Sequence, residues 1–398
     1  MKTLKNTYRW LFVGVFSLIV SHIALAQDVI SENDASASSA EKDSVEVSLL
    51  TCSPGTELYS LYGHTALRYH DLRTGVDMTF NYGVFNFRQE FFILKFIFGL
   101  TDYELGICPM QYFVKEYERR GSQVTEQVIN FTPEEKRSIY RALTDNYKPQ
   151  NRVYRYNCLY DNCTTRARDM IEKNLVGEVT YNKSASPRSY RDMLRQYTEK
   201  YPWATFGNDL ILGFGADREV DGRQQQFLPE YMMIDAERAT ILRDGQYRQL
   251  VKESRCAVEG GVQIIEQPFP ITPFECSLLL LVIAIAVMVV ELQRKTVFRL
   301  WDTLLMTLSG LAGILLFAML FSQHPTTSTN LQVLLLNPLP LFFLPRLWRK
   351  KDDDTFWRIA VVMYSLFFLG GIIQDYAEGM FCVGAALASR CIVHFKLR

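Results

Sequence analysis

Hydrophobic positions divide this chain into two unequal parts. Before about residue 270 the apolar residues occur in short runs broken by polar ones, whereas the last third holds four or five long apolar segments. A helix of roughly 20 residues crosses the apolar core of a bilayer, and one segment, 303–323, is long enough to cross alone. The segments are 276–290, 303–323, 331–344, 359–374 and 379–393, of which the last is interrupted by Arg390 and followed by His394. We therefore expect an all-α transmembrane bundle over residues 271–398.

The loops between these segments predict the orientation of the bundle. Lys and Arg residues lie between the first and second segments and between the third and fourth, whereas the loops 322–330 and 375–379 contain neither. Positively charged loops stay in the cytoplasm. The chain is therefore expected to enter the membrane from outside, near residue 275.

The N-terminus has the pattern of an export signal. Basic residues at positions 2, 5 and 9 precede an apolar run over 10–20, and Ala24-Leu25-Ala26 forms a small-residue cleavage site. We expect a signal peptide over 1–26 and a flexible, polar leader over 27–44; an uncut anchor is the alternative. Both ends of the chain thus predict a multi-pass protein of the cytoplasmic (inner) membrane, with residues 45–270 in the periplasm.

The charge balance of the chain argues against one class of partner, nucleic acid. The chain of 398 residues carries 43 Lys and Arg against 43 Asp and Glu. Such a balance lacks the positive excess that binds a phosphate backbone, so we expect no nucleic-acid partner.

Between the leader and the membrane, the pattern predicts an α+β domain. A hairpin is expected from strand 58–70, turn 71–75 and strand 76–82, because apolar and β-branched residues flank a turn-forming stretch. Helix 132–147 is expected from an N-cap Thr132, Pro133 at its first position and Glu135 three residues after the cap. A strand over 153–160 and a helix over 163–175 follow, and the region 201–226 allows no assignment.

The run FFILKFIFGL at 91–100 is the densest aromatic segment of this domain. It allows two interpretations. One is a buried core helix, and the other is an interfacial segment lying against the bilayer, which the adjacent membrane region makes plausible.

Five cysteines fall in the periplasmic domain, namely Cys52, Cys108, Cys158, Cys163 and Cys256. An odd number outside the cytoplasm leaves at least one thiol unpaired within the chain. A free thiol there is a candidate for catalysis.

Cys163 is the strongest candidate. Asp161, Asn162 and Thr164 cluster where a helix would begin, so the thiol lies at the positive end of that helix, which lowers a thiol pKa and favours the nucleophilic thiolate. Helical spacing puts Ala167 and Ile171 on the same face, so the side chain should point towards the protein body. The N–H groups of the same turn could also hold an oxyanion.

A thiolate nucleophile requires a general base. The domain offers two imidazoles, and His64 is preferred because it lies mid-strand, whereas His70 abuts the turn. Depending on register, Asn81 or Tyr82 lies opposite His64, and we favour Asn81 as the orienting group of a Cys163-His64-Asn81 arrangement. No cofactor or metal is needed for this chemistry.

Other interpretations stay open on spacing alone. His64 could be a structural strand histidine. Cys163 could form a disulfide with Cys158 or another cysteine, or bind zinc together with Cys158 and His64, although a fourth ligand is not obvious.

At these residues the chain resembles known families. A strand histidine in YGHTALRY, followed about a hundred residues later by an Asn-Cys pair opening a helix, resembles the permuted papain-like fold of lecithin:retinol acyltransferase-like and NlpC/P60 enzymes. The motifs GHTALRY, NYGVFNF, YDNCTTRARD, FGNDLILGFGADR and FLPEYMM, together with the polytopic tail, resemble the lipoprotein N-acyltransferase family of Bacteroides-type bacteria. The resemblance covers most of residues 45–395.

The resemblance implies an acyl transfer from a phospholipid donor, through a thioester, to the N-terminal amine of a diacylated lipoprotein acceptor. Cys163 matches the nucleophile position and His64 the base position. Lecithin:retinol acyltransferase-like enzymes use a second histidine as the third residue, which this hairpin lacks. A cell-wall peptidase or amidase of the NlpC/P60 type is the alternative enzyme, and a membrane-tethered assembly protein is the non-enzymatic alternative.

Overall fold

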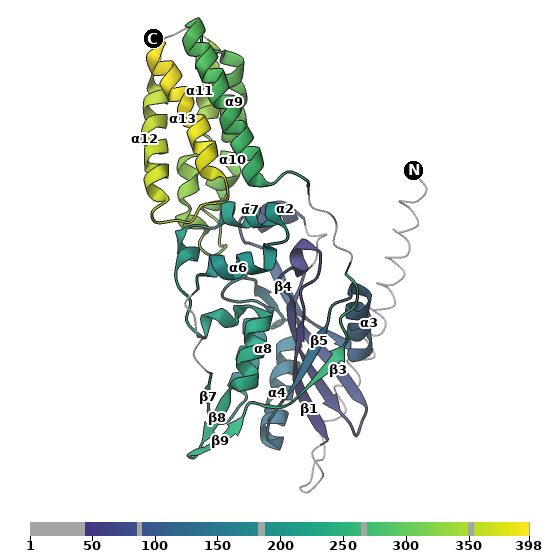
Figure 1. Cartoon of the computed structure of the whole chain (residues 1–398). Helices are drawn as coiled ribbons and strands as arrows, with labels where there is room; N and C mark the ends of the chain where they lie inside the picture. The colour runs from purple at the N-terminus through teal and green to yellow at the C-terminus, as the bar shows by residue number, and fades with distance from the viewer. Residues whose placement is uncertain (1–43, 86–89, 182–187, 264–268, 349–353, 398) are drawn as a thin grey trace, which may run out of the picture. The chain divides into compact units, whose positions relative to one another are not determined.

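The computed structural model describes residues 44–85, 90–181, 188–263, 269–348 and 354–397. The predicted signal peptide and nearly all of the predicted leader lie outside the described residues. The described chain contains a domain of strands and helices over residues 45–258, followed by an all-helical C-terminal region (Figure 1). This layout confirms the predicted fold class at that level.

Seven antiparallel strands form the main sheet of the first domain, in the order β10-β5-β1-β2-β3-β4-β6. Their bounds are β1 Val45–Cys52, β2 His64–Asp71, β3 Val76–Val84, β4 Asp102–Pro109, β5 Val124–Ile129, β6 Val153–Arg155 and β10 Val251–Val258. A smaller sheet contains β7 Glu178–Thr180, β8 Thr240–Arg243 and β9 Gln246–Gln249. The predicted hairpin is β2 and β3, joined by the turn after Asp71.

Helices bury both faces of the main sheet. Along β1, Val47 and Leu49 join the core formed with α4 (Pro133–Tyr147), α5 (Cys163–Lys173) and α8 (Pro229–Arg238). Leu50 and Cys52 alternate with them, because successive strand residues point to opposite faces. These two residues join a second core with α3 (Met110–Arg120). The hairpin therefore lies between α5 on one face and α3 on the other.

The helix predicted from Thr132 is confirmed. The Thr132 hydroxyl accepts a hydrogen bond from the backbone of Glu135, and the Glu135 carboxylate accepts one from the backbone of Thr132. This reciprocal capping satisfies two of the donors that a helix start leaves unpaired. Glu135 also accepts from Arg248 of β9, so the same carboxylate ties α4 to the smaller sheet.

Two predicted strands are shorter than expected. β2 begins at His64 rather than at 58, because a short 3-10 helix over Leu58–Ser60 and a turn through Gly63 precede it. Gly63 has φ +76°, and a Cβ there would lie 2.6 Å from the carbonyl oxygen of Cys52. That close approach requires glycine. The strand predicted over 153–160 is confined to β6, because the chain turns at Asn157 to pair with Asp161.

The aromatic run at 91–100 is not a buried core helix. It contains the short helix α2, Phe92–Ile97, and most of its large side chains are exposed, with Phe91 and Ile93 both at 72%. That exposure excludes the first of the two interpretations and leaves the interfacial one open.

The region 201–226, to which the sequence allowed no assignment, is held together by ion pairs and hydrogen bonds to one buried arginine. α6 (Tyr190–Thr198), α7 (Pro202–Ile211) and two 3-10 helices, Phe214–Asp217 and Gln224–Phe227, lie around one arginine. Arg191 is 1% exposed, and its guanidinium donates to Asp209 at 3.0 Å and Asp217 at 2.5 Å. It also donates to the backbone carbonyls of Leu212 and Gly213. A single side chain thus satisfies acceptors from four positions of the motif FGNDLILGFGADR.

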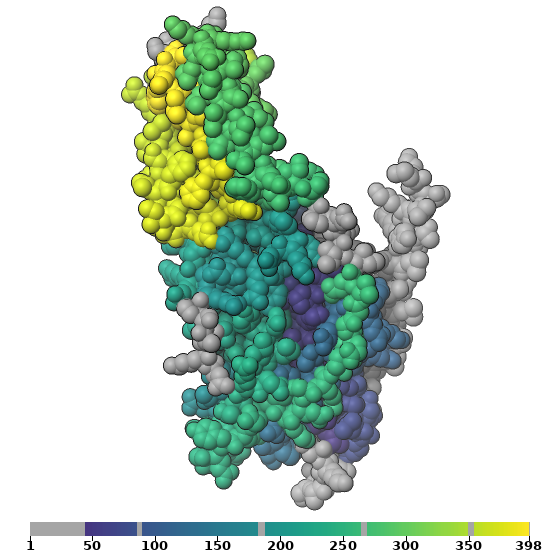
Figure 2. All heavy atoms as spheres, viewed as in Figure 1, coloured from purple at the N-terminus to yellow at the C-terminus, as the bar shows by residue number. Residues whose placement is uncertain are grey.

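The C-terminal region consists of helices whose outer side chains are apolar. They are α9 Pro273–Arg294, α10 Arg299–Met319, α11 Leu339–Trp348, α12 Thr355–Gly370 and α13 Met380–Lys396. Within the described residues, three stretches, 273–294, 299–319 and 331–348, are apolar and long enough to cross a membrane. In the space-filling view, the side chains of α9 (green) and α13 (yellow) meet on the viewed face (Figure 2).

Buried ion pairs explain why Arg390 and His394 do not interrupt α13. Arg390 donates to Asp302 at 2.6 Å and to Glu291, and His394 is 2.8 Å from the other oxygen of Asp302. Charges in an apolar region persist when they are paired with one another. The fifth apolar segment, which is the one interrupted by a charged residue, is therefore held against α9 and α10 by the ion pairs of Arg390 and His394.

The Arg191 cluster generates the first prediction. Arg191→Met removes the only guanidinium that reaches Asp217 and the two carbonyls among the described contacts, so we expect a loss of about 3–5 kcal/mol of unfolding free energy. Arg137→Met is the matched control, because Arg137 pairs with Glu134 on an exposed helix surface and such pairs contribute about 0–1 kcal/mol. Thermal denaturation of the detergent-solubilised full chain measures both. Equal melting temperatures for the two variants would contradict the account.

Candidate active site

Cys163 is the first residue of α5, as predicted. Asn162 caps the helix, because its side-chain oxygen accepts from the backbone N–H groups of Thr164 at 2.9 Å and Thr165 at 3.0 Å. Ala167 and Ile171 on the same face are fully buried, so the thiol points into the domain. The cap also corrects one expectation: these two N–H groups already have an acceptor and are not free to hold an oxyanion.

His64 begins β2, and its ring nitrogen Nε2 is in hydrogen-bond contact with the side-chain oxygen of Asn81 on β3. An amide oxygen only accepts, so Nε2 carries the hydrogen and Nδ1 is left to face another group. The predicted reason for this contact was wrong. The β2–β3 pairing ends at Leu67 and Phe80, and continuing that register would put Gly83 opposite His64. Asn81 instead reaches His64 diagonally, on the face of the sheet that α3 covers.

The structure brings the thiol and the imidazole together. Burial opposes the charged form of the Cys163 thiol, but the net pKa of this thiol is lowered, first by the positive charge of His64 and by a hydrogen bond from it. The backbone N–H of Thr65 and the hydroxyl of Thr164 lower it further. For His64, burial opposes the charged form, yet the Cys163 charge and the hydrogen bonds to Cys163 and Asn81 raise its pKa. Both shifts favour a thiolate–imidazolium pair.

Gly83 lies beside Cys163. It has φ +91°, and a Cβ there would lie 3.9 Å from both the Cβ of Cys163 and the ring of Tyr156. The β3–β4 pairing is irregular between Asn81 and Val84, which is typical of a β-bulge, and bulges often re-aim side chains beside functional sites. The irregularity begins directly after Asn81, the residue that contacts His64.

Sequence reasoning missed the residues that surround the dyad from α3. Cys52 pairs with His64 across β1 and β2, and it shares a hydrogen bond with the Tyr117 hydroxyl. Burial raises the pKa of the Cys52 thiol well above its ordinary value, so Cys52 stays protonated beside the pair. Arg120 acts electrostatically on His64 and opposes its charged form. No local motif marks these residues, because β1 and α3 come to His64 only through the tertiary packing of the sheet face that α3 covers.

The same geometry bears on the disulfide and zinc alternatives for Cys163, and on Tyr82 as the alternative third residue. All eight cysteines are free in the described residues, Cys158 and Cys163 included. Loss of hydration raises the pKa of Cys158 to about 11, so of these two neighbouring thiols only Cys163 is activated. Tyr82, the alternative third residue, is a buried core side chain whose hydroxyl donates to Asn146 at 2.7 Å. Within the described ranges, no group of three His, Cys, Asp or Glu side chains is arranged to hold a metal ion.

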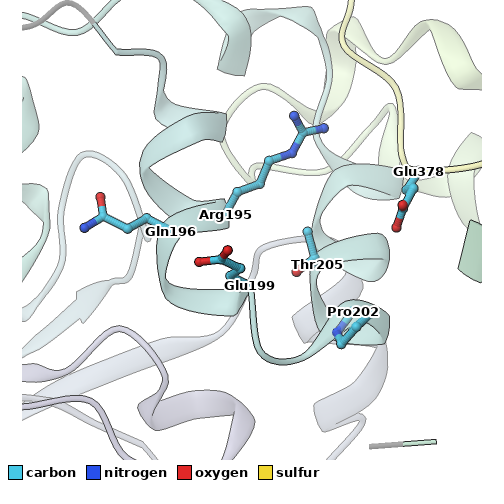
Figure 3. Close-up of a pocket in the computed structure, with 6 residues that line it drawn as sticks. All are labelled: Arg195, Gln196, Glu199, Pro202, Thr205 and Glu378. Atoms are coloured by element: carbon cyan, nitrogen blue, oxygen red, sulfur yellow. The ribbon is translucent and has the colours of Figure 1, made fainter. Parts of the chain in front are cut away.

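An open cleft of about 360 Å³ lies elsewhere (Figure 3). Its lining residues are Arg195, Gln196, Glu199, Pro202, Thr205 and Glu378, from α6, α7 and the segment before α13. None belongs to the dyad or to β2, β3 and α5. Arg195 is held by Asp209 at 2.8 Å and by Asp375, so its charge is already paired.

Comparison with known families defines the class of protein: a membrane protein with an N-terminal periplasmic domain and a transmembrane domain. Residues 32–198 match the model described as the Lnb N-terminal periplasmic domain, and residues 264–398 match the model described as the Lnb transmembrane domain. The two matches together cover most of the chain, which therefore belongs to the Lnb family. The resemblance to lipoprotein N-acyltransferases is thus confirmed at the level of the family. Comparisons with curated proteins and with solved structures each found no match.

The dyad generates the second prediction. Because His64 lowers the pKa of Cys163, alkylation of Cys163 by iodoacetamide should begin at lower pH than for an ordinary thiol. In His64→Ala the lowering contributions of the imidazole are lost and burial dominates, so the midpoint should move to higher pH. Peptide mass spectrometry across a pH series measures the alkylation of this residue.

His70→Ala is the control, since His70 lies at the other end of β2 and contacts Arg68. A midpoint that is unchanged in His64→Ala, or that moves equally in both variants, would contradict the proposed pairing.

Proposed function

We propose that this protein is a cysteine-dependent lipoprotein N-acyltransferase, with Cys163 as nucleophile, His64 as general acid and base, and Asn81 as the group that orients His64. The observation that carries the proposal is the Cys163–His64 pair, in which the thiol pKa is lowered and the imidazole pKa is raised. Membership of the Lnb family and the adjoining transmembrane domain support a lipid substrate.

The first half-reaction forms a thioester. The Cys163 thiolate attacks the ester carbonyl carbon of a phospholipid, and a C–S bond forms as the C–O bond of the ester breaks. The departing lysophospholipid oxygen takes the proton of the His64 imidazolium. The raised pKa of His64 keeps that proton available, while the lowered pKa of Cys163 keeps the attacking sulfur charged.

The second half-reaction transfers the acyl chain. The N-terminal amine of a diacylglyceryl-cysteine lipoprotein attacks the thioester carbonyl, so that a C–N bond forms and the C–S bond breaks. Neutral His64 takes the proton of the amine, and the thiolate–imidazolium pair is restored. The Asn81 oxygen holds Nε2–H throughout, which keeps Nδ1 aimed at the sulfur and the reacting groups.

The order of the elements supports a permuted papain-like arrangement for this domain. The histidine strand β2 precedes the cysteine helix α5 along the chain, and the two are in contact in the folded domain. In such an arrangement a helix start provides the thiolate and a strand of the sheet provides the base. The proposal of a periplasmic acyl-transfer site above a multi-pass inner-membrane anchor follows from combining this arrangement with the transmembrane domain.

The proposed function generates the third prediction. In cells that depend on this gene, Cys163→Ala should abolish N-acylation of lipoproteins, and His64→Ala should lower it by roughly 10²–10⁴-fold, the contribution of a general acid–base group. Mass spectrometry of lipoprotein N-termini measures the third acyl chain directly.

Cys158→Ala is the matched control, because Cys158 is five residues away and its pKa is raised. It should leave triacylation intact. Unchanged triacylation in Cys163→Ala would refute the proposal, and cleavage of cell-wall peptides by the wild type without lipoprotein acylation would favour the peptidase alternative.

A further inference from the structure

The exposed aromatic helix α2 lies at the end of an apolar span. His324 Nε2 is 2.6 Å from the carbonyl oxygen of Phe96, and the backbone N–H of Gln323 donates to the carbonyl oxygen of Phe98 at 2.9 Å. Residues 323 and 324 follow α10, which ends at Met319. Two hydrogen bonds therefore hold α2 against the segment that follows the end of α10.

The outer surface of α10 continues into α2. Phe317 and Phe321 of this span are exposed, with their rings 5.5 Å apart, and Phe96 lies edge-on to His324 at the same distance. On α2 the exposed side chains are Phe91, Ile93, Leu94 and Phe96. Exposed apolar and aromatic side chains beside the end of an apolar span are typical of a segment that lies in a membrane interface.

Phe91, which precedes α2, is held in an unusual conformation. Its φ is +56°, in the left-handed region that bulky residues rarely adopt. Such strain persists only when the surrounding structure imposes it.

A row of aromatic rings connects α2 to the candidate active site. Phe92 stacks with Phe96 at 6.1 Å and with Phe85 at 6.4 Å, and Phe85 lies 5.0 Å from Tyr103. Tyr103 stacks on Tyr156 at 4.3 Å. Tyr156 and the Cβ of Cys163 meet the same point above Gly83. Phe92, Phe85, Tyr103 and Tyr156 are each partly exposed residues.

We propose that α2 inserts into the outer leaflet of the membrane, and that the aromatic row from Phe96 to Tyr156 binds the acyl chain of an outer-leaflet phospholipid on its way to Cys163. The proposal rests on the proposed function for the fate of that chain. Aromatic rings offer an apolar surface of low conformational freedom, which suits a flexible alkyl chain. Gly83 lies beside both Tyr156 and Cys163, at the end of the row.

Photo-cross-linking tests the binding of the chain without relying on catalysis. Full-length Cys163→Ala protein is reconstituted in phosphatidylethanolamine nanodiscs that contain a trace of a phospholipid with a diazirine on its acyl chain. After irradiation, peptide mass spectrometry should find cross-links on α2 and on Tyr103 or Tyr156, as well as on α9–α13. Cross-links confined to α9–α13 would overturn the proposal.

Comparing the acylation of Cys163 by two donors tests whether the aromatic row binds the acyl chain. Tyr103→Ser removes one ring of the row, and Tyr247→Ser is the matched control, because Tyr247 is 71% exposed on β9. With a long-chain phospholipid, Tyr103→Ser should slow thioester formation by about tenfold or more. With a soluble short-chain ester, both variants should match the wild type.

The outcomes separate the two proposals. If Tyr103→Ser slows thioester formation equally with both donors, this ring supports the Cys163–His64 pair rather than binding the acyl chain. That result would overturn the proposed binding of the acyl chain along the aromatic row. No acylation of wild-type Cys163 by either donor would refute the proposed function instead. The cross-links decide the binding of the chain in either case.

Discussion

The site depends on one interaction, the attraction between the Cys163 thiol at the start of α5 and His64 at the start of β2, a strand in the middle of the main sheet. Burial works against both charges, yet each partner stabilises the charged form of the other, and the net shifts have opposite signs in the two residues. The fold supplies what this balance requires. A helix start holds the sulfur, a strand start holds the ring, and Asn81 holds the ring's far nitrogen.

Local signals in the sequence were sufficient for several of these parts. The cap at Asn162 and the capping residues around Thr132 are short-range patterns with a direct physical cause, and both helices begin where those patterns indicate. The turn after Asp71 likewise set the β2–β3 hairpin. Asn81 is predicted from a register that the sheet does not have, and it contacts His64 from a diagonal position on β3.

Contacts between distant segments could not be predicted in this way. The start of β2 depends on the approach of Gly63 to the carbonyl of Cys52, and the environment of His64 depends on Arg120 of α3 and, through Cys52, on Tyr117 of the same helix. Arg191 orders a region that has no clear periodicity. The sequence does not reveal its partners, because they lie up to 26 residues away along the chain. These features arise from tertiary packing, which overrides or supplements local preference.

Intact-mass measurement of the purified full-length protein with a phospholipid donor tests the central claim most directly. The account predicts a mass increase of one acyl chain, located by peptide analysis on Cys163, released by a diacylated lipopeptide amine and absent in Cys163→Ala. An acyl adduct on Cys158 or another cysteine, or a native disulfide at Cys163, would contradict it.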